Sequence, residues 1–205
     1  MHDLLKFWFE LTRDWGYVGV FILMACESSI LPLPSEVVIP PAAFWAAQGR
    51  LSFGGVLAAA IAGSYAGSLL SYWLARAIGL GWIPRFGKYL LLDEKKIIFA
   101  SRWAEHYGVW GVFFARLLPG VRHLISLPAG FLRMDLAKFS GSTLVGASIW
   151  CWVLAVFGQK VLGAHPELLN SPTEMLLAVK HEMLPVFLLV AGLMAAMLVL
   201  RRMRV

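Results

Sequence analysis

Two stretches of the chain place charged residues and prolines inside sequence that is otherwise apolar enough to lie in a membrane. The first, CESSILPLPSEVVIPPAAFW, carries Glu27 and Glu36, and the second, FFARLLPGVRHLISLPAGF, carries Arg116 and Arg122. A charge in hydrocarbon costs about 2.5–3.5 kcal/mol on insertion scales unless it is paired or hydrated, and prolines there remove backbone donors. The two stretches therefore indicate a polar site that handles a charged substrate.

The composition is that of an integral membrane protein. Hydrophobic residues make up 60% of the 205 residues and charged residues only 15%, far from the averages of soluble proteins. The net charge of +6 lies in clusters beside apolar segments, which predicts contact with anionic lipids and excludes nucleic-acid binding. Cys26 and Cys151 have no spacing that suits a metal site or a disulfide framework, so we expect no metal and no cofactor.

The first half of the chain predicts a short interfacial helix, a hairpin and a span. The apolar segment after the interfacial helix (1–14) meets Glu27 after about ten residues, half of the roughly 20 that a span needs. We expect a re-entrant helical hairpin over 16–48, with Ser35 capping its second half-helix, and a membrane span over 52–77. Small residues at every fourth position of that span (Ala59, Gly63, Gly67 and Ser71) predict close helix packing without chemistry.

The second half repeats this pattern. An amphipathic helix is predicted over 93–107, and a second re-entrant hairpin over 109–133, interrupted at Pro119–Gly120 and again at Pro128. Spans over 136–160 and 184–200 complete a single domain, 1–205. The predicted class is an all-α integral membrane protein with two re-entrant hairpins, about three full transmembrane helices and amphipathic interfacial helices.

Basic residues predict the orientation. Arg201, Arg202 and Arg204 place the C-terminus in the cytoplasm, and the two hairpins then enter from opposite faces. Opposed hairpins, each followed by a span, form an inverted repeat, as in many secondary transporters. Arg50 and the basic residues near the N-terminus argue against this orientation.

Arg116 and Arg122 are the candidate ligands of a substrate phosphate, because guanidinium groups bind phosphate oxygens in pairs and stay charged when buried. They flank Gly120, and a half-helix starting near Val121 is expected to offer free N–H groups to an anion. His123 is a candidate accessory group, together with Ser35 and Gly120. The alternative is that the arginines only form structural salt bridges with the two glutamates.

Glu27 and Glu36 are the candidate proton carriers. Burial raises the pKa of a carboxylate, and a nearby arginine lowers it. An acid that exchanges its arginine partner for an anionic substrate would therefore change its protonation during a transport cycle. His123 would add a group that titrates near neutral pH.

The two interrupted motifs resemble those of the DedA family of bacterial membrane proteins, also called the SNARE-associated or VTT-domain superfamily. The resemblance rests on ESSILPLPSEVVIPPAAF, on FFARLLPGVRHLISLPAGFLRM and on the amphipathic segment before the second motif. It implies two opposed re-entrant hairpins. It also implies translocation of undecaprenyl phosphate, or of phospholipids such as phosphatidylethanolamine, linked to proton motive force. The functional positions of the family fall on Glu27, Arg116 and Arg122, with Glu36 at the second acidic position.

The expected function is therefore a multi-pass lipid transporter, or flippase, of the bacterial plasma membrane, whose partners are lipids and protons. The alternative is a proton-coupled exporter of small cations or drugs, in which the glutamates bind the substrate. An enzyme such as a lipid phosphatase is not expected and no catalytic residues are assigned, because His106 and His123 lack the spacing of that chemistry. The sequence is also compatible with a homo-oligomer.

Overall fold

The computed structural model describes residues 2–29, 35–79, 94–118, 121–122 and 124–165, and seven isolated residues further on: Leu168, Glu174, Leu177, Ala178, Pro185, Leu188 and Gly192. In the N-terminal helix, side chains are described for Trp8 and from Leu11 onward. In the helix that begins at residue 94, they are described from Ser101 onward. Gly120, His123 and most of the predicted span over 184–200 lie outside the described residues.

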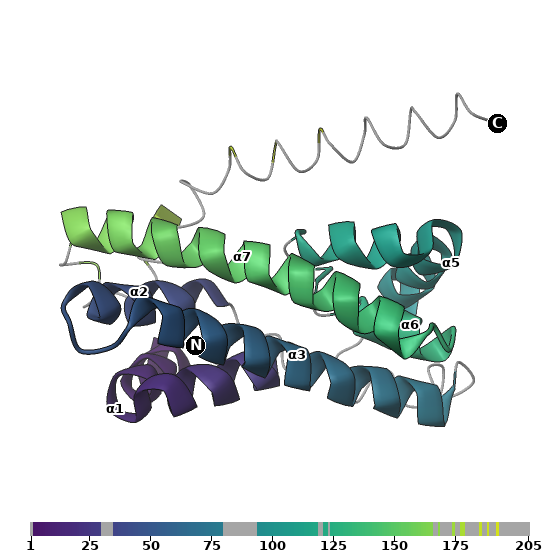
Figure 1. Cartoon of the computed structure of the whole chain (residues 1–205), viewed down its shortest axis with the longest axis horizontal. Coiled ribbons are helices and arrows are strands. Elements are labelled where there is room, and N and C mark those ends of the chain that lie inside the picture. The colour runs from purple at the N-terminus through teal and green to yellow at the C-terminus, as the bar shows by residue number, and fades with distance from the viewer. Residues whose placement is uncertain are drawn as a thin grey trace.

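The described residues form helices joined by turns, which confirms the all-helical class. The elements are α1 (His2–Glu27), the 3₁₀ turn η1 (Ser35–Val37), α2 (Ile39–Ala47), α3 (Phe53–Ile78), α5 (Glu94–Arg116), α6 (Ser126–Phe131) and α7 (Leu136–Ala164). Figure 1 shows α3 and α7 lying side by side along the long axis of the molecule.

Two of the described helices, α3 and α7, are long and apolar enough to cross a bilayer. They contain 26 and 29 residues, with mean hydropathies of 1.5 and 1.6 in their most apolar windows. At about 1.5 Å per residue, each exceeds the roughly 30 Å of a hydrocarbon core. Their outer faces expose large apolar side chains, among them Leu70 and Trp73 on α3 and Val145, Ile149 and Trp152 on α7. Such faces suit contact with lipid tails.

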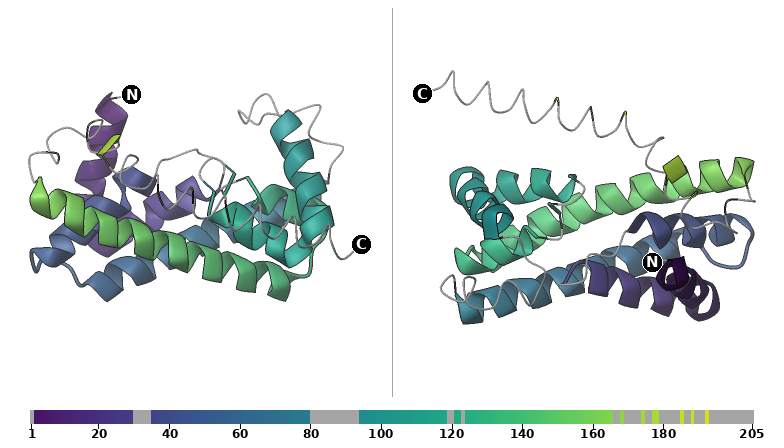
Figure 2. Two further views of the ribbon diagram at one scale, coloured as in Figure 1. Left: turned by 90° about the horizontal axis from the view of Figure 1, so that it is seen from above. Right: turned by 180° about the vertical axis from the view of Figure 1, so that it is seen from behind.

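A glycine kinks each of the two helices that precede the interrupted motifs. Gly16 in α1 has φ 53° and ψ −125°, and Gly108 in α5 has φ 55° and ψ −129°. This region of backbone space is open only to glycine, which has no Cβ. In the left view of Figure 2, the first parts of α1 (purple) and α5 (teal) stand at opposite ends of the molecule and project from the same side.

The short helices α2 and α6 end in the same hydrogen-bond pattern. The N–H groups of Gly49 and Arg50 donate to the carbonyls of Ala46 and Trp45, and those of Arg133 and Met134 donate to Gly130 and Ala129. Both are Schellman motifs, which need a left-handed residue. Gly49 takes this conformation at φ 75° and Arg133 at φ 50°.

The second interruption predicted at Pro128 is wrong. Pro128 lies in the first turn of α6, as Pro40 and Pro41 lie in the first turn of α2. A proline is tolerated there because the first N–H groups of a helix have no partner within the helix. These prolines therefore start the short helices and do not break them.

Glycines let the helices approach one another closely. A Cβ on Gly63 or Gly67 of α3 would collide with the carbonyl oxygen of Phe21 or Ala25 of α1. Gly130 of α6 lies equally close to α3, and Gly158 of α7 to α2. The predicted packing role of the small residues in the first span therefore holds at Gly63 and Gly67, and these contacts fix the end of α1 against the middle of α3.

Replacing Gly67 tests this contact. Gly67→Ala should destabilise the protein by about 1–3 kcal/mol, because overpacking forces α1 away from α3. Gly54→Ala is the matched control, since no atom lies near the added Cβ in the first turn of the same helix. Thermal unfolding in detergent, followed by size-exclusion chromatography, compares the two variants. Equal melting temperatures would show that the close contact between Gly67 and the backbone of α1 does not stabilise the packing of α1 on α3.

Candidate functional site

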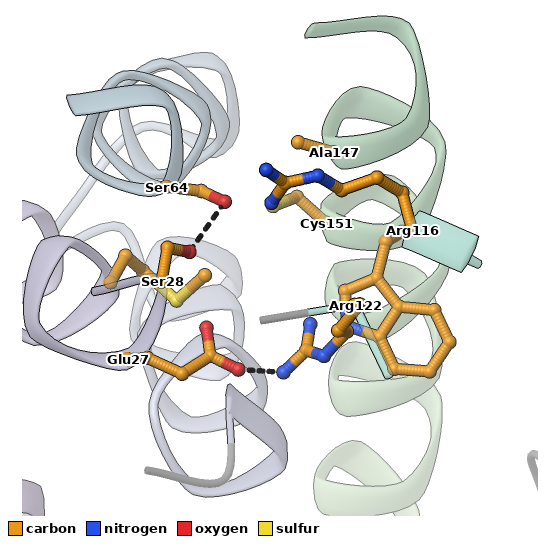
Figure 3. Close-up of a pocket in the computed structure, with 9 residues that line it drawn as sticks. Glu27, Ser28, Ser64, Arg116, Arg122, Ala147 and Cys151 are labelled. Carbon is orange, nitrogen blue, oxygen red and sulfur yellow. Dashed lines mark hydrogen bonds and ion pairs between the residues drawn. The ribbon is translucent and has the colours of Figure 1, made fainter. Parts of the chain in front are cut away.

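A small polar cavity lies where the ends of α1 and α5 meet the middles of α3 and α7. Its volume is about 10 Å³, roughly the room that one water molecule requires. The lining residues come from both interrupted motifs and from both long helices: Met24, Glu27, Ser28, Ser64, Arg116, Arg122, Ala147, Trp150 and Cys151 (Figure 3).

Arg122 lies on one side of the cavity and contacts three different elements. Its Nη2 atom forms an ion pair with Oε1 of Glu27 at the end of α1. The same nitrogen donates to Oγ of Ser35 in η1 at 2.6 Å. The guanidinium carbon lies 4.8 Å from the ring centroid of Trp150 on α7, a cation–π geometry. Arg122 thereby joins the second interrupted motif to the first.

Ser35 does not cap α2, contrary to the sequence prediction. The N-cap position of α2 is Val38, which makes no side-chain capping bond. The hydroxyl of Ser35 accepts hydrogen bonds from Arg122 and, at 3.3 Å, from the indole nitrogen of Trp150. Because Ser35 is the first residue of η1 and Val38 occupies the N-cap position of α2, the side chain of Ser35 is available to the site.

Arg116 also lines the cavity, on the same side as Arg122 in Figure 3, and is only 3% exposed. Its Nη2 atom donates to Oγ of Ser126 at 2.7 Å, but its buried Nε has no hydrogen-bond partner. Across the cavity, the hydroxyls of Ser28 and Ser64 are hydrogen-bonded to each other at 2.8 Å (Figure 3). A buried donor without an acceptor costs about 1–3 kcal/mol. An acceptor oxygen bound at Nε of Arg116 would remove this cost.

The charges of the cavity do not balance. Two guanidinium groups and one carboxylate line it, which leaves one positive charge in excess among these residues. All three side chains are buried, with Glu27 at 2% and Arg122 at 8% exposure. Removing charges from water is costly unless they are paired, so an additional anion would be stabilised here.

Four backbone N–H groups at and after Val121 are not free, contrary to the sequence prediction. The N–H groups of Val121 and Arg122 already donate to the carbonyl of Leu118, and those of Leu124 and Ile125 donate to Val121. The chain turns tightly after α5, and α6 begins only at Ser126. These four N–H groups are therefore not available to an anion, and the donors that the described residues offer at the cavity are side chains.

The structure brings Glu27, Arg116 and Arg122 together, as three of the four charges predicted for the site. Glu36 is buried at 7% exposure beside Ser35, but it is not one of the nine residues that line the cavity. The accessory candidates Gly120 and His123 lie outside the described residues. Among the described residues, no group of His, Cys, Asp or Glu side chains suits a metal ion.

Sequence reasoning missed six of the nine side chains that line the cavity, and also Ser126, which binds Arg116; the six are Met24, Ser28, Ser64, Ala147, Trp150 and Cys151. One signal was available for Trp150. Membrane tryptophans gather at the interfaces, whereas this residue lies in the middle of a predicted span. The serines carried no such signal, because serine is common wherever membrane helices pack closely.

Comparison with known proteins places the chain in one family of sequences. The VTT domain matches residues 33–160. Undecaprenyl phosphate transporter A of Staphylococcus aureus is 33% identical over 154 residues, which cover 73% of this chain and 76% of that protein. The protein of the same name in Bacillus subtilis is 33% identical over 145 residues, or 71% of each chain.

Another relative has a different kind of name. The alkaline phosphatase-like protein of Lactococcus lactis subsp. lactis is 34% identical over 154 residues, which cover 73% of this chain and 72% of that protein. No solved structure matches this chain at a significant level.

Proposed function

The chain belongs to the VTT-domain family, also called the DedA family, and on this premise we propose that it transports an anionic lipid across the bacterial plasma membrane. The proposed substrate is a lipid with a phosphate head group, of the undecaprenyl phosphate type or a phospholipid. The observation that carries the proposal is the buried cavity in which two arginines face a single carboxylate.

The chemistry of a phosphate suits this arrangement. A phosphate monoester carries about 1.5 to 2 negative charges at pH 7 and offers three acceptor oxygens. One oxygen would satisfy the unpartnered Nε of Arg116, and others would take the place of Glu27 on Arg122. Because the cavity holds no more than about one water, we propose that the described conformation is the closed one and that the substrate enters as the two motifs separate.

We also propose that 16–48 and 109–133 are re-entrant hairpins of an inverted repeat, with the C-terminus in the cytoplasm. Supporting features are the matching kinks at Gly16 and Gly108 and the matching Schellman motifs. The packing is also reciprocal: α1 packs on α3 and α2 on α7, while α5 packs on α7 and α6 on α3. The projecting parts of α1 and α5 lie at opposite ends of the molecule (Figure 2).

Cysteine labelling tests the inverted repeat. Gln48 and Lys138 are exposed residues, the first between α2 and α3 and the second in the first turn of α7. A membrane-impermeant maleimide should label Lys138→Cys from the cytoplasmic face and Gln48→Cys from the outer face. The unsubstituted protein controls for Cys26 and Cys151. Labelling of both new cysteines from one face would exclude opposed hairpins.

A flipping assay in proteoliposomes tests the transport proposal. With a fluorescent lipid phosphate and competing polyprenyl phosphate, Arg116→Ala and Arg122→Ala should each weaken competition at least tenfold. That factor corresponds to about 1.4 kcal/mol, the lower end of what a hydrogen bond to a charged group contributes. The exposed Arg102 on α5 provides a control, since Arg102→Ala should behave as the unsubstituted protein.

The same assay weighs the rival functions. Unchanged competition in both cavity variants, with folding intact, would remove the arginines from substrate binding. A cation exporter is disfavoured by the excess positive charge of the lining. The phosphatase-like name of one relative suggests cleavage of a lipid phosphate, and release of inorganic phosphate in the same vesicles would support that reading. Among the nine lining residues there is no histidine or aspartate for such chemistry.

We further propose that Glu27 and Glu36 couple transport to protons. When phosphate displaces Glu27 from Arg122, the buried carboxylate loses its cation and is expected to take up a proton. Glu27→Gln and Glu36→Gln should then abolish the response of flipping to a pH gradient and leave the protein folded. Flipping with and without the gradient measures this, and Glu105→Gln on the exposed face of α5 is the control. A variant that keeps the full response removes its carboxylate from the coupling role.

A further inference from the structure

Trp150 lies inside the protein although it occupies the middle of a membrane span. It is 3% exposed, whereas Trp152 two residues later on the same helix is 54% exposed. The two tryptophans therefore lie on the same helix but in different surroundings. Trp152 belongs to the outer face of α7, and Trp150 lines the cavity with Ala147 and Cys151 (Figure 3).

Trp150 makes two contacts that converge on one guanidinium group. Its ring lies 4.8 Å from the guanidinium carbon of Arg122. Its indole nitrogen donates to Oγ of Ser35, and that oxygen also accepts from Arg122 at 2.6 Å. The cation–π contact orients the plane of the guanidinium group. The hydrogen bond to Ser35 fixes the position of the oxygen that accepts a hydrogen bond from Arg122. Packing alone would account for the buried ring but not for this shared acceptor.

These contacts differ from the ion pair in one respect. Glu27 must leave Arg122 if a phosphate is to bind there, whereas the ring of Trp150 and the hydroxyl of Ser35 carry no charge and need not move. A free arginine side chain has several rotatable bonds, and fixing it on binding costs affinity. A guanidinium that stays in place when its carboxylate departs avoids that loss.

We propose that Trp150, acting with Ser35, is a positioning residue that keeps Arg122 oriented toward a lipid phosphate after Glu27 has been displaced. The inference rests on the proposed function and names the side chains that preorganise its phosphate site. Because Trp150 acts on Arg122, and Arg122 binds the phosphate, replacing Trp150 should weaken binding of the phosphate group and leave binding of the lipid tail unchanged.

The experiment measures the affinity of the purified full chain in detergent for farnesyl phosphate and for farnesol, two compounds that share the same tail and differ only in the phosphate group. The ratio of the two dissociation constants reports the phosphate group alone. Trp150→Leu should lower the phosphate preference about tenfold or more, the range expected of a desolvated cation–π contact. Trp150→Phe keeps an aromatic ring but loses the donor to Ser35, and should fall between. Trp152→Leu should match the unsubstituted protein.

The outcomes separate the two proposals. If the unsubstituted protein shows no preference for farnesyl phosphate over farnesol, the proposed function fails. If the unsubstituted protein shows the preference and Trp150→Leu retains it, the positioning role fails. This holds even if Trp150→Leu lowers the affinities for farnesyl phosphate and farnesol by the same factor, because an equal loss is expected of a purely structural residue. Should Trp150→Leu not fold, Trp150→Phe and Ser35→Ala give the same readout, and an unchanged preference in both overturns the inference.

Discussion

The buried ion pair between Glu27 and Arg122 is the interaction on which the arrangement of this protein depends. Each charge alone would be strongly unfavourable in an apolar interior, and breaking a buried pair by removing one partner typically costs 3–5 kcal/mol. The two partners come from the two interrupted motifs, almost a hundred positions apart in sequence. Their mutual requirement therefore brings the end of α1 against the turn after α5. A pair of apolar residues would hold the two motifs together as well, but it would offer nothing to a charged substrate.

Close helix packing makes this meeting possible. Gly63 and Gly67 let α1 approach the backbone of α3, and Gly146 leaves room beside the Cβ of Arg116 on α5. The kinks at Gly16 and Gly108 change the direction of α1 and α5 about two to three turns before their charged ends. Glycine thus serves two separate purposes, unusual backbone angles in the kinks and the absence of a side chain at the crossings.

Much of the site could be predicted from the sequence because burial of charge is a strong constraint. Glu27, Arg116 and Arg122 stand out in apolar sequence, and the VTT-domain match over residues 33–160 includes both arginines. What could not be predicted depends on local turn geometry and on contacts between distant elements. The N–H groups of Val121, Arg122, Leu124 and Ile125 are not free as expected, because they form hydrogen bonds within the turn after α5. Ser35 serves Arg122 and not α2, because η1 intervenes before the helix begins. Neither the hydrogen bonds of this turn nor the partner of Ser35 can be predicted from residue types and their spacing in the sequence.

The small size of the cavity has an electrical consequence. A space of about 10 Å³ does not support a continuous column of water beside the buried charges. Voltage across a membrane falls where water is excluded, so the buried charges of Glu27 and Arg122 would lie within that drop. Moving one elementary charge through a full drop of 100 mV involves about 2.3 kcal/mol. A rearrangement that moves one of these charges along the membrane normal would then be work done with or against the electric field of the cell.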